Sequence, residues 1–201
     1  MHTQALRMSK IKKGIIAGKK GFTLAEVLMV MTIIGIISAI SLPAIHYLYC
    51  STCLKAAVYE LCDMIKEAKH NALNNGTYYS ITFNTSSGVI SLVSDKGEDE
   101  TWNTSDDRVV RSFRLSDKGG GLRFSQGSYG PLKIDGKYLA EAPDGVSFPT
   151  NNTCVCNPEL TGNSGVVYIM SVAGSAMAVK MNSTDYGYAI YRWDGKGWAQ
   201  M

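Results

Sequence analysis

The residues of this chain that could carry chemistry are few, and its cysteines come first among them. Two short spacings occur, Cys50 with Cys53 and Cys154 with Cys156, and such pairs are typical of zinc sites when they lie on turns. Cys50 and Cys53 instead fall in a segment with helical periodicity, far along the chain from the 154–156 loop. Cys62 lies one position from an apolar stripe, as expected for a small packing residue. We therefore expect no metal site and no cofactor.

Disulfide pairing cannot be assigned from these spacings. A Cys154–Cys156 bond would close a tight, strained ring, and a Cys50–Cys53 bond inside a helix is geometrically awkward. The five cysteines also leave at least one thiol free or paired between chains.

Histidines and glycine-rich motifs give no support for catalysis. His2, His46 and His70 have no serine, aspartate or cysteine arrangement typical of a nucleophile. No phosphate-binding loop is present, and no Gly-x-Gly-x-x-Gly precedes a helix. The glycine run 119–121 indicates a turn before a strand. We expect a protein that is not an enzyme.

Two surface features could bind a partner, and both have a simpler interpretation. The segment 95–107 reads DKGEDETWNTSDD, and oxygen-rich loops can bind calcium, but the EF-hand pattern is absent. We expect a solvated acidic loop. Trp193 and Trp198, with Arg192 and Lys196 nearby, could stack on nucleic acid or glycan. Packing in the core or at a sheet edge is favoured.

The positive charge of the chain is concentrated at its start. The net charge is +3, yet residues 1–21 contain six lysines and arginines and no acid, which leaves 14 basic and 17 acidic residues beyond them. The remainder therefore has no polybasic patch of the kind that binds duplex nucleic acid.

An uncharged segment follows this basic start. Val27 to Ile45 contains 19 residues without a charge, close to the roughly 20 apolar residues that span a bilayer as a helix. The alternative is a buried core helix, which usually keeps a polar face. Because the cations precede the span, the positive-inside rule predicts a cytoplasmic N-terminus and an extracytoplasmic remainder.

Three kinds of targeting segment share this layout. A secretory signal peptide needs a small-residue cleavage site after the apolar run, and Ser38-Ala39-Ile40 is a poor one. A lipoprotein signal needs small residues before its cysteine, but Tyr49 precedes Cys50. The third kind is a leader removed before the apolar run, which leaves the span in the mature protein.

The third kind has a recognisable form in residues 19–26, which read KKGFTLAE. A basic leader ends in Gly21, Phe22 follows, Glu26 stands five positions after the glycine, and Pro43 lies within the apolar helix. This arrangement resembles the processing motif of type IV pilins and type II secretion pseudopilins. The resemblance covers residues 10–50.

The resemblance implies a structural role. A prepilin peptidase would cleave between Gly21 and Phe22 and methylate the new Phe22 amine. Glu26 would pair with the methylated amine of a neighbouring subunit, and Pro43 would soften the helix. The partners would be the peptidase, other pilin-like subunits and the bacterial inner membrane. A second interpretation of Glu26 is that it stabilises the helix N-terminus through the macrodipole.

The end of the chain extends the resemblance loosely. Residues 165–198, GVVYIMSVAGSAMAVKMNSTDYGYAIYRWDGKGW, resemble the closing strands of the GspH/FimT group of minor pseudopilins, with 187–193 as the best match. We expect a minor or tip subunit. A filament-tip binding module for DNA, a surface or secretion cargo is the alternative, although nucleic-acid binding is not favoured. The sequence does not distinguish a pilus from a secretion or DNA-uptake machine.

Periodicity predicts the architecture. Apolar residues spaced three and four apart continue the helix to Asn74, ending in one stripe: Leu54, Val58, Leu61, Ile65, Ala68 and Ala72. Beyond Gly76 the period becomes two. A hairpin is expected from 77–83 and 89–94, with further strands at 108–115, 121–124, 133–139, 165–171, 176–181 and 187–193.

The predicted fold class is α+β, with a long N-terminal transmembrane helix that continues into an amphipathic helix on an antiparallel sheet domain. The expected divisions are a leader at 1–21, an assembly helix at 22–45, its amphipathic continuation at 46–76 and a β-rich domain at 77–201.

Overall fold

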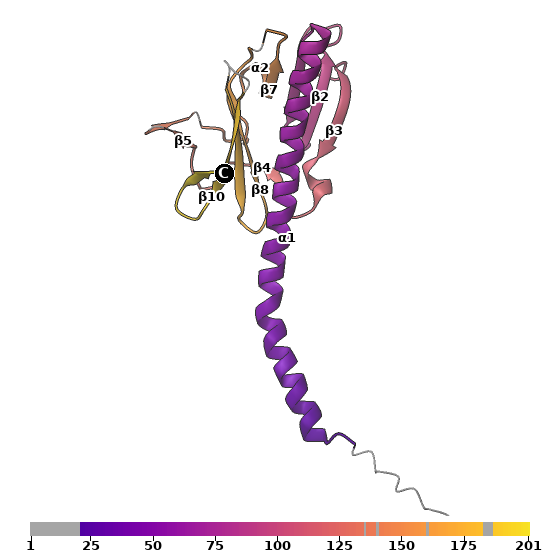
Figure 1. The fold of residues 1–201 in the computed structure, drawn as a ribbon, viewed down its shortest axis with the longest axis vertical. Helices are drawn as coiled ribbons and strands as arrows, with labels where there is room; N and C mark the ends of the chain where they lie inside the picture. The colour runs from indigo at the N-terminus through magenta and orange to yellow at the C-terminus, as the bar shows by residue number, and fades with distance from the viewer. Residues whose placement is uncertain (1–20, 135, 140, 160, 183–186) are drawn as a thin grey trace, which may run out of the picture. The chain divides into compact units, whose positions relative to one another are not determined.

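The computed structural model describes residues 21–201, except 135, 140, 160 and 183–186 (Figure 1). The expected leader therefore lies almost entirely outside the described residues. The chain divides into a first unit, Met1–Ser41, and a second unit, Leu42–Met201, which are described separately. Helix α1 (Leu24–Asn75) runs from the first unit into the second and includes Pro43, so the expected helix is confirmed to within two residues at each end.

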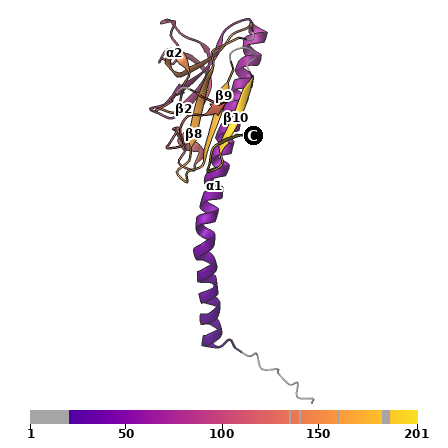
Figure 2. The ribbon, with the colours of Figure 1, turned by 90° about the vertical axis from the view of Figure 1, so that its left-hand side faces the viewer.

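The second unit contains two antiparallel sheets beside the C-terminal half of α1 (Figure 2). Sheet A has the order β3-β2-β1-β7, with β1 (Tyr79–Asn84), β2 (Val89–Asp95), β3 (Arg108–Arg114) and β7 (Thr153–Cys156). Sheet B has the order β11-β10-β9-β8-β4, with β4 (Arg123–Phe124), β8 (Gly165–Met170), β9 (Ala176–Met181), β10 (Tyr188–Trp193) and β11 (Trp198–Gln200). A hairpin of β5 (Lys133–Ile134) and β6 (Lys137–Tyr138) and two short helices, η1 (Leu115–Lys118) and α2 (Pro149–Asn152), complete it.

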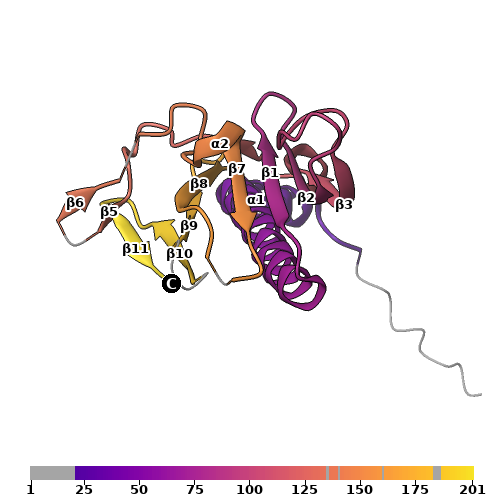
Figure 3. The ribbon, with the colours of Figure 1, turned by 90° about the horizontal axis from the view of Figure 1, so that it is seen from above.

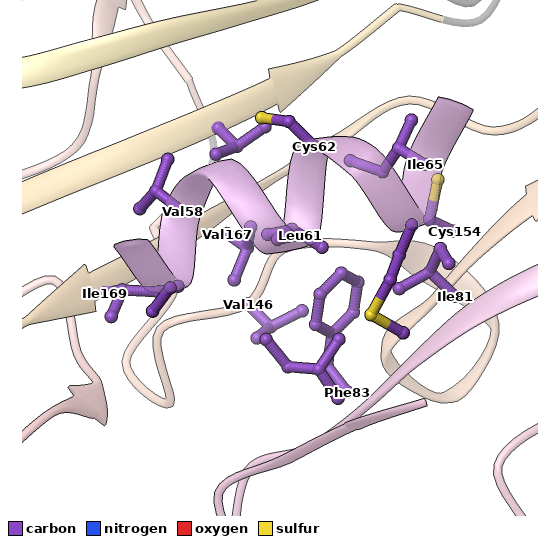
Figure 4. Packing of buried hydrophobic residues seen from close by; sticks show 14 of the residues in the cluster. Val58, Leu61, Cys62, Ile65, Ile81, Phe83, Val146, Cys154, Val167 and Ile169 are labelled. Carbon is purple, nitrogen blue, oxygen red and sulfur yellow. The ribbon is translucent and has the colours of Figure 1, made fainter. Parts of the chain in front are cut away.

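The core lies between α1 and the inner faces of both sheets. Every residue of the expected helical stripe is at most 1% exposed, which confirms the stripe. Leu61 and Ile65 from the helix meet Phe83 from sheet A and Val167 from sheet B in one cluster, part of which is drawn in Figure 4. Figure 3 shows the strands of the two sheets in succession around the helix. The α+β fold class is thereby confirmed.

The outer face of sheet B carries a second, smaller cluster. Val166 and Tyr168 of β8 pack there with Leu132 from the connection that contains the β5–β6 hairpin. The Leu132 N–H donates to the Tyr168 hydroxyl at 2.9 Å, which ties that connection to the sheet. Successive side chains of a strand point to opposite faces of the sheet. β8 therefore contributes Val167 and Ile169 to the main core and Val166 and Tyr168 to the smaller cluster.

The two C-terminal tryptophans pack on other aromatic rings. Trp193 stacks on Tyr129 with ring centres 4.7 Å apart, and Trp198 meets Trp193 at 5.7 Å. The Trp198 indole N–H donates to the carbonyl of Gly130 at 3.2 Å. The expected packing role is therefore confirmed for both tryptophans.

The strand predictions are wrong in two places. Residues 154–156 were expected in a loop but form part of β7, which pairs with β1 through Cys154 opposite Ile81. β-Branched Thr153 and Val155 suit a strand, but four residues between turns give too short a signal. The expected strand 133–139 is a hairpin, because Gly136 turns the chain with a φ of +80°.

The glycine run 119–121 allows a loop to approach α1 closely. All three glycines have positive φ. A Cβ on Gly120 would lie 3.1 Å from the Cys53 Cβ and 3.2 Å from the Cys50 Cα. The turn expected here is present. Glycine is needed in it for two reasons, the positive φ and the lack of space for a side chain against α1.

A side chain and a short backbone bridge, Cys156 with Gly162, close the outer edge of β7. The Val155 N–H donates to Asn163 Oδ1 at 2.8 Å, and Asn163 Nδ2 donates to the Thr153 carbonyl at 2.5 Å. The amide of Asn163 thus takes the place of a peptide group from another strand, which satisfies backbone groups that a sheet edge leaves unpaired.

Candidate assembly site at the start of the first helix

The start of α1 is fixed by a reciprocal pair of side chains. The Thr23 N–H and the Thr23 hydroxyl both donate to Glu26 Oε2, at 2.8 and 3.0 Å. The Glu26 N–H donates back to Thr23 Oγ1 at 3.2 Å. This is a capping box, in which a threonine before the helix and a glutamate in its first turn satisfy each other's backbone donors. Gly21 and Phe22 precede the box in non-helical conformation.

The first half of the helix after this box is exposed in the part of the chain that the structure describes. From Leu24 to Tyr49 every side chain is exposed except that of Ser41, which is half-buried. Two of its hydroxyls are satisfied within the helix, because Thr32 donates to the Leu28 carbonyl and Ser41 to the Ile37 carbonyl, each at 2.8 Å. By length and composition α1 can cross a membrane.

The comparison with protein families matches this segment. The model described as the prokaryotic N-terminal methylation motif matches residues 16–42, which include the capping box and most of the exposed apolar run. The N-terminal segment therefore carries the methylation motif that the sequence predicts. The resemblance to pilins and pseudopilins is confirmed, whereas the assignment to the GspH/FimT group stays a prediction.

A solved structure is also similar to this chain. It is the minor pseudopilin EpsH from the type 2 secretion system of Vibrio cholerae, at 8% identity and a TM-score of 0.39, covering 74% of this chain and 95% of that one. A TM-score of this size supports no inference about function. No curated protein matches the chain significantly.

The cysteines of the described chain are buried. Cys50 Sγ lies 3.8 Å from His46 Nε2, one helical turn away, a pairing that the sequence analysis missed although the spacing of four residues indicates it. The Cys50 residue is 0% exposed, so a substrate has no access to its thiol. In the part of the chain that the structure describes, no group of three or more His, Cys, Asp or Glu could hold a metal ion.

Two carboxylates of the acidic segment 95–107 accept hydrogen bonds from backbone N–H groups of the same segment. Asp106 Oδ2 accepts from the Glu98 N–H at 2.8 Å, and Asp107 Oδ2 accepts from the Asn103 N–H at 2.8 Å. A hydrogen bond from the Thr104 hydroxyl is the largest of the effects that lower the pKa of Asp106. Asp106 is exposed, as expected for a solvated loop.

Part of the segment 95–107 is buried and bonded to α2, which the prediction of a solvated loop did not include. Trp102 is only 8% exposed, and its carbonyl accepts from Asn151 Nδ2 at 3.0 Å. Asn103 Nδ2 donates to the Asn151 carbonyl at 2.9 Å, so two amides join this loop to α2. Backbone φ is positive at Asn103 and at three successive residues from Thr150, conformations that these bonds help to hold.

A charged network joins the C-terminal half of α1 to the chain that follows β2. Glu60 Oε1 accepts from Arg111 at 3.1 Å, Glu60 Oε2 pairs with Lys118, and Arg111 also lies 3.6 Å from Glu67. Burial acts to raise the pKa of Glu60, but the bonds from Lys118 and Arg111 outweigh it and the pKa is lowered.

Proposed function

We propose that this chain is a prepilin-like structural subunit, without catalytic activity, that is incorporated into a type IV pilus or a type II secretion pseudopilus. The methylation motif at residues 16–42, joined to an apolar helix that its own chain leaves exposed, carries the proposal. The division into a leader at 1–21, an assembly helix at 22–45, its continuation at 46–76 and a β-domain at 77–201 belongs to the same proposal.

Processing takes place at the bond between Gly21 and Phe22. A prepilin peptidase cleaves there and methylates the new Phe22 amine. The conformation of the segment supports this step, because both residues precede the first residue of α1 and the Phe22 side chain is 87% exposed. No atom of the described chain lies within 4 Å of a Cβ built on Gly21.

Glu26 then joins one subunit to the next. A charged side chain near the centre of a bilayer costs about 2.5–3.5 kcal/mol on insertion scales, and less at the edge. Both bonds from Thr23 reach Glu26 Oε2, and no bond reaches Oε1 within the described residues. Oε1 is therefore available to the methylated amine of a neighbouring subunit.

The helix is anchored in the bacterial inner membrane before assembly. The N-terminus faces the cytoplasm and the β-domain faces the extracytoplasmic side, as the basic residues before the span require. Pro43, which removes one backbone donor from α1, softens the helix as subunits pack. We assign the chain a minor or tip position.

Intact mass of the mature chain tests processing. We expect a chain that starts at Phe22 and carries one added methyl group. A mature chain that starts near residue 45 would show a removable signal peptide and would overturn the proposal.

Substitution of Glu26 tests assembly. Glu26→Ala should be processed normally but should fail to co-purify with filaments, since the neighbouring amine loses its partner. Asp63→Ala removes an exposed carboxylate from the same helix and is the matched control, with normal incorporation expected. Co-purification of Glu26→Ala at the level of the control contradicts the pairing.

The position of the subunit is tested by labelling purified filaments with an antibody against the β-domain. Label confined to filament ends supports a tip subunit. Label along the whole length contradicts that assignment and indicates a major subunit.

A further inference from the structure

The turn between β8 and β9 lies against the part of α1 that follows the uncharged run (Figure 1). The Val172 N–H donates to the Gly120 carbonyl at 3.2 Å, and a Cβ on Gly120 would lie 3.2 Å from the Cys50 Cα. Cys50 is five residues beyond Ile45, where the uncharged run ends. Five residues of helix measure about 7.5 Å. The turn therefore lies close to the level at which α1 would leave a membrane.

The backbone donors of this turn are paired within the protein. The Ser171 N–H donates to the Ser175 carbonyl at 2.9 Å, and the Gly174 N–H donates to the Ser171 carbonyl at 3.1 Å. The Ser175 N–H donates to Ser171 Oγ at 3.2 Å, and the Val172 N–H is bonded to Gly120 as described. An unpaired backbone group is costly where water is scarce. A turn with paired donors can therefore enter the poorly hydrated boundary of a bilayer at little cost.

The turn exposes one apolar side chain. Val172 is 58% exposed, whereas Ser171 and Ser175 on either side of it are buried. No residue from 168 to 179 carries a charge. A single exposed apolar side chain is common on protein surfaces, so the role of Val172 depends on what lies beside it.

Helix α1 presents aromatic and apolar side chains beside the turn. Tyr47, Leu48 and Tyr49 are 45%, 63% and 55% exposed. A Cβ on Gly119 would meet the Tyr49 hydroxyl, so this ring lies beside the glycine loop that also contacts the turn. Tyrosine is enriched where the hydrocarbon of a bilayer gives way to headgroups, because its ring is apolar and its hydroxyl polar. Val172 therefore continues a surface that begins on the helix and suits this boundary.

We propose that the β8–β9 turn docks on the extracytoplasmic surface of the bilayer that α1 crosses, with Val172 entering the boundary between headgroups and acyl chains beside Tyr47 and Tyr49. The partner is lipid, because this surface is continuous with the exposed apolar run of α1. The headgroup layer is about 5–7 Å deep on each side of the hydrocarbon core, which is comparable to the helix length from Ile45 to Cys50.

The docking would give the β-domain a second point of contact with the membrane. It rests on the membrane anchorage proposed above and adds to it a fixed orientation of the β-domain, because a contact away from the helix axis prevents rotation about that axis. Entry into a filament would then have to break this contact.

The test uses the full chain in phosphatidylcholine liposomes at a low protein-to-lipid ratio. An environment-sensitive nitrobenzoxadiazole label is attached to one added cysteine, and a nitroxide on the lipid acyl chain next to the headgroup serves as the quencher. The label on Val172→Cys should be quenched and blue-shifted. The unmodified chain, taken through the same labelling, measures any background from the buried cysteines.

Val109→Cys is the matched control, because Val109 is also a valine about half exposed, at 50%. It lies on β3, where Arg111 is 3.6 Å from Glu67. Glu67 is about 25 Å beyond Cys50 along the helix. The label on Val109→Cys should therefore keep its fluorescence.

A label on Ile34→Cys, in the exposed half of α1, separates the docking from the membrane anchorage. A nitroxide near the end of the acyl chains should quench the label at position 34 more strongly than the label at position 172. Quenching at position 34 with none at position 172 overturns the docking and leaves the anchorage intact. No quenching at position 34 overturns both.

A second variant tests whether Val172 itself causes the docking. A label on Ala173→Cys should be quenched by lipid, and the added substitution Val172→Asp should abolish that quenching, whereas Val109→Asp should not. Equal quenching in the two double variants contradicts the role of Val172. Energy transfer between labels at position 172 of different chains, without quenching by lipid, would show that a second copy of the chain covers this surface and would overturn the proposal.

Discussion

The two halves of α1 share one secondary structure and have opposite surroundings. Every side chain from Leu24 to Tyr49 is exposed or half-buried, whereas twelve residues between Cys50 and Ala72 are buried. The first half carries no charge from Val27 to Ile45, while the second carries one apolar stripe between charged residues. The second half is therefore stabilised by its own β-domain, whereas the exposed apolar surface of the first half needs lipid or other helices to cover it.

The polar groups of the two halves are satisfied in different ways. In the first half Thr32 and Ser41 bond to carbonyls of the same helix, which suits a medium without water. In the second half Glu60 bonds to Arg111 and Lys118, from sheet A and η1. Substitutions in the second half should therefore affect unfolding, and those in the first half should affect assembly.

The largest effect on unfolding is expected from Leu61→Ala. The side chain is 0% exposed in the core between helix and sheets, so its truncation should lower the free energy of unfolding by about 3 kcal/mol. Ile34→Ala, in the exposed half, should change it by less than about 0.5 kcal/mol. Denaturant unfolding of the full chain in detergent, followed by tryptophan fluorescence, measures both. Equal losses of unfolding free energy in the two variants would contradict the different surroundings of the two halves.

A second effect, about 2 kcal/mol, is expected from Gly120→Ala. The new Cβ would meet Cys53 and Cys50 at 3.1 and 3.2 Å in a backbone with a φ of +65°. Gly35→Ala is the counterpart in the first half, where nothing lies within 4 Å of the added atom. Gly35→Ala should leave the unfolding free energy of the β-domain unchanged in the same experiment. A Gly120→Ala chain as stable as Gly35→Ala would show that the loop has room to move.

A smaller effect, on the order of 1 kcal/mol at neutral pH, is expected from Glu60→Gln. The pKa of Glu60 is lowered in the folded chain, so its stabilisation is complete above the pKa of the unfolded carboxyl. It is lost as the pH falls through the lower, folded value. The difference in unfolding free energy between Glu60→Gln and the unmodified chain should therefore shrink below about pH 4.5. Asp63→Asn, which breaks an exposed pair with Lys66, should have little effect at any pH; a constant difference for Glu60→Gln would contradict the ionic cause.

The smallest effect on global unfolding is expected from Thr23→Val. Loss of the hydroxyl removes half of the capping box, which should weaken the first turn by about 1 kcal/mol and speed amide exchange there about fivefold. The unfolding midpoint of the β-domain should not move. Thr23→Ser keeps the hydroxyl and should exchange like the unmodified chain. Hydrogen exchange with mass spectrometry measures both, and equal exchange in the two variants would show that the box does not hold the helix start.

Much of the fold could be predicted because its signals are local. The stripe from Leu54 to Ala72 follows helical spacing, and the β1–β2 hairpin follows from alternation on either side of a Gly-containing turn. β7 could not be predicted in this way, because its pairing with β1 joins residues more than seventy positions apart. The need for glycine at position 120 could not be predicted for the same reason, because it arises from contact with Cys50 and Cys53, which lie far away in the sequence.

The residues of the candidate site could be predicted from the sequence, but the hydrogen bonds between them were not. Gly21, Phe22, Glu26 and Pro43 were identified by resemblance, and their roles in processing and assembly remain predictions. The bond between Thr23 and Glu26 was missed, although a threonine three positions before a glutamate is the signature of a capping box.

The capping box also bears on the order of events. The donor that Glu26 binds is the N–H between Phe22 and Thr23, and that peptide group lies beyond the bond proposed for cleavage. Removal of the leader would therefore leave the box intact. The first turn of α1 is formed while residues 1–21 are still attached, so the proposed cleavage would take place just before a helix that has already formed. Cleavage at this bond would then change the charge at the end of the chain without refolding the first turn of α1.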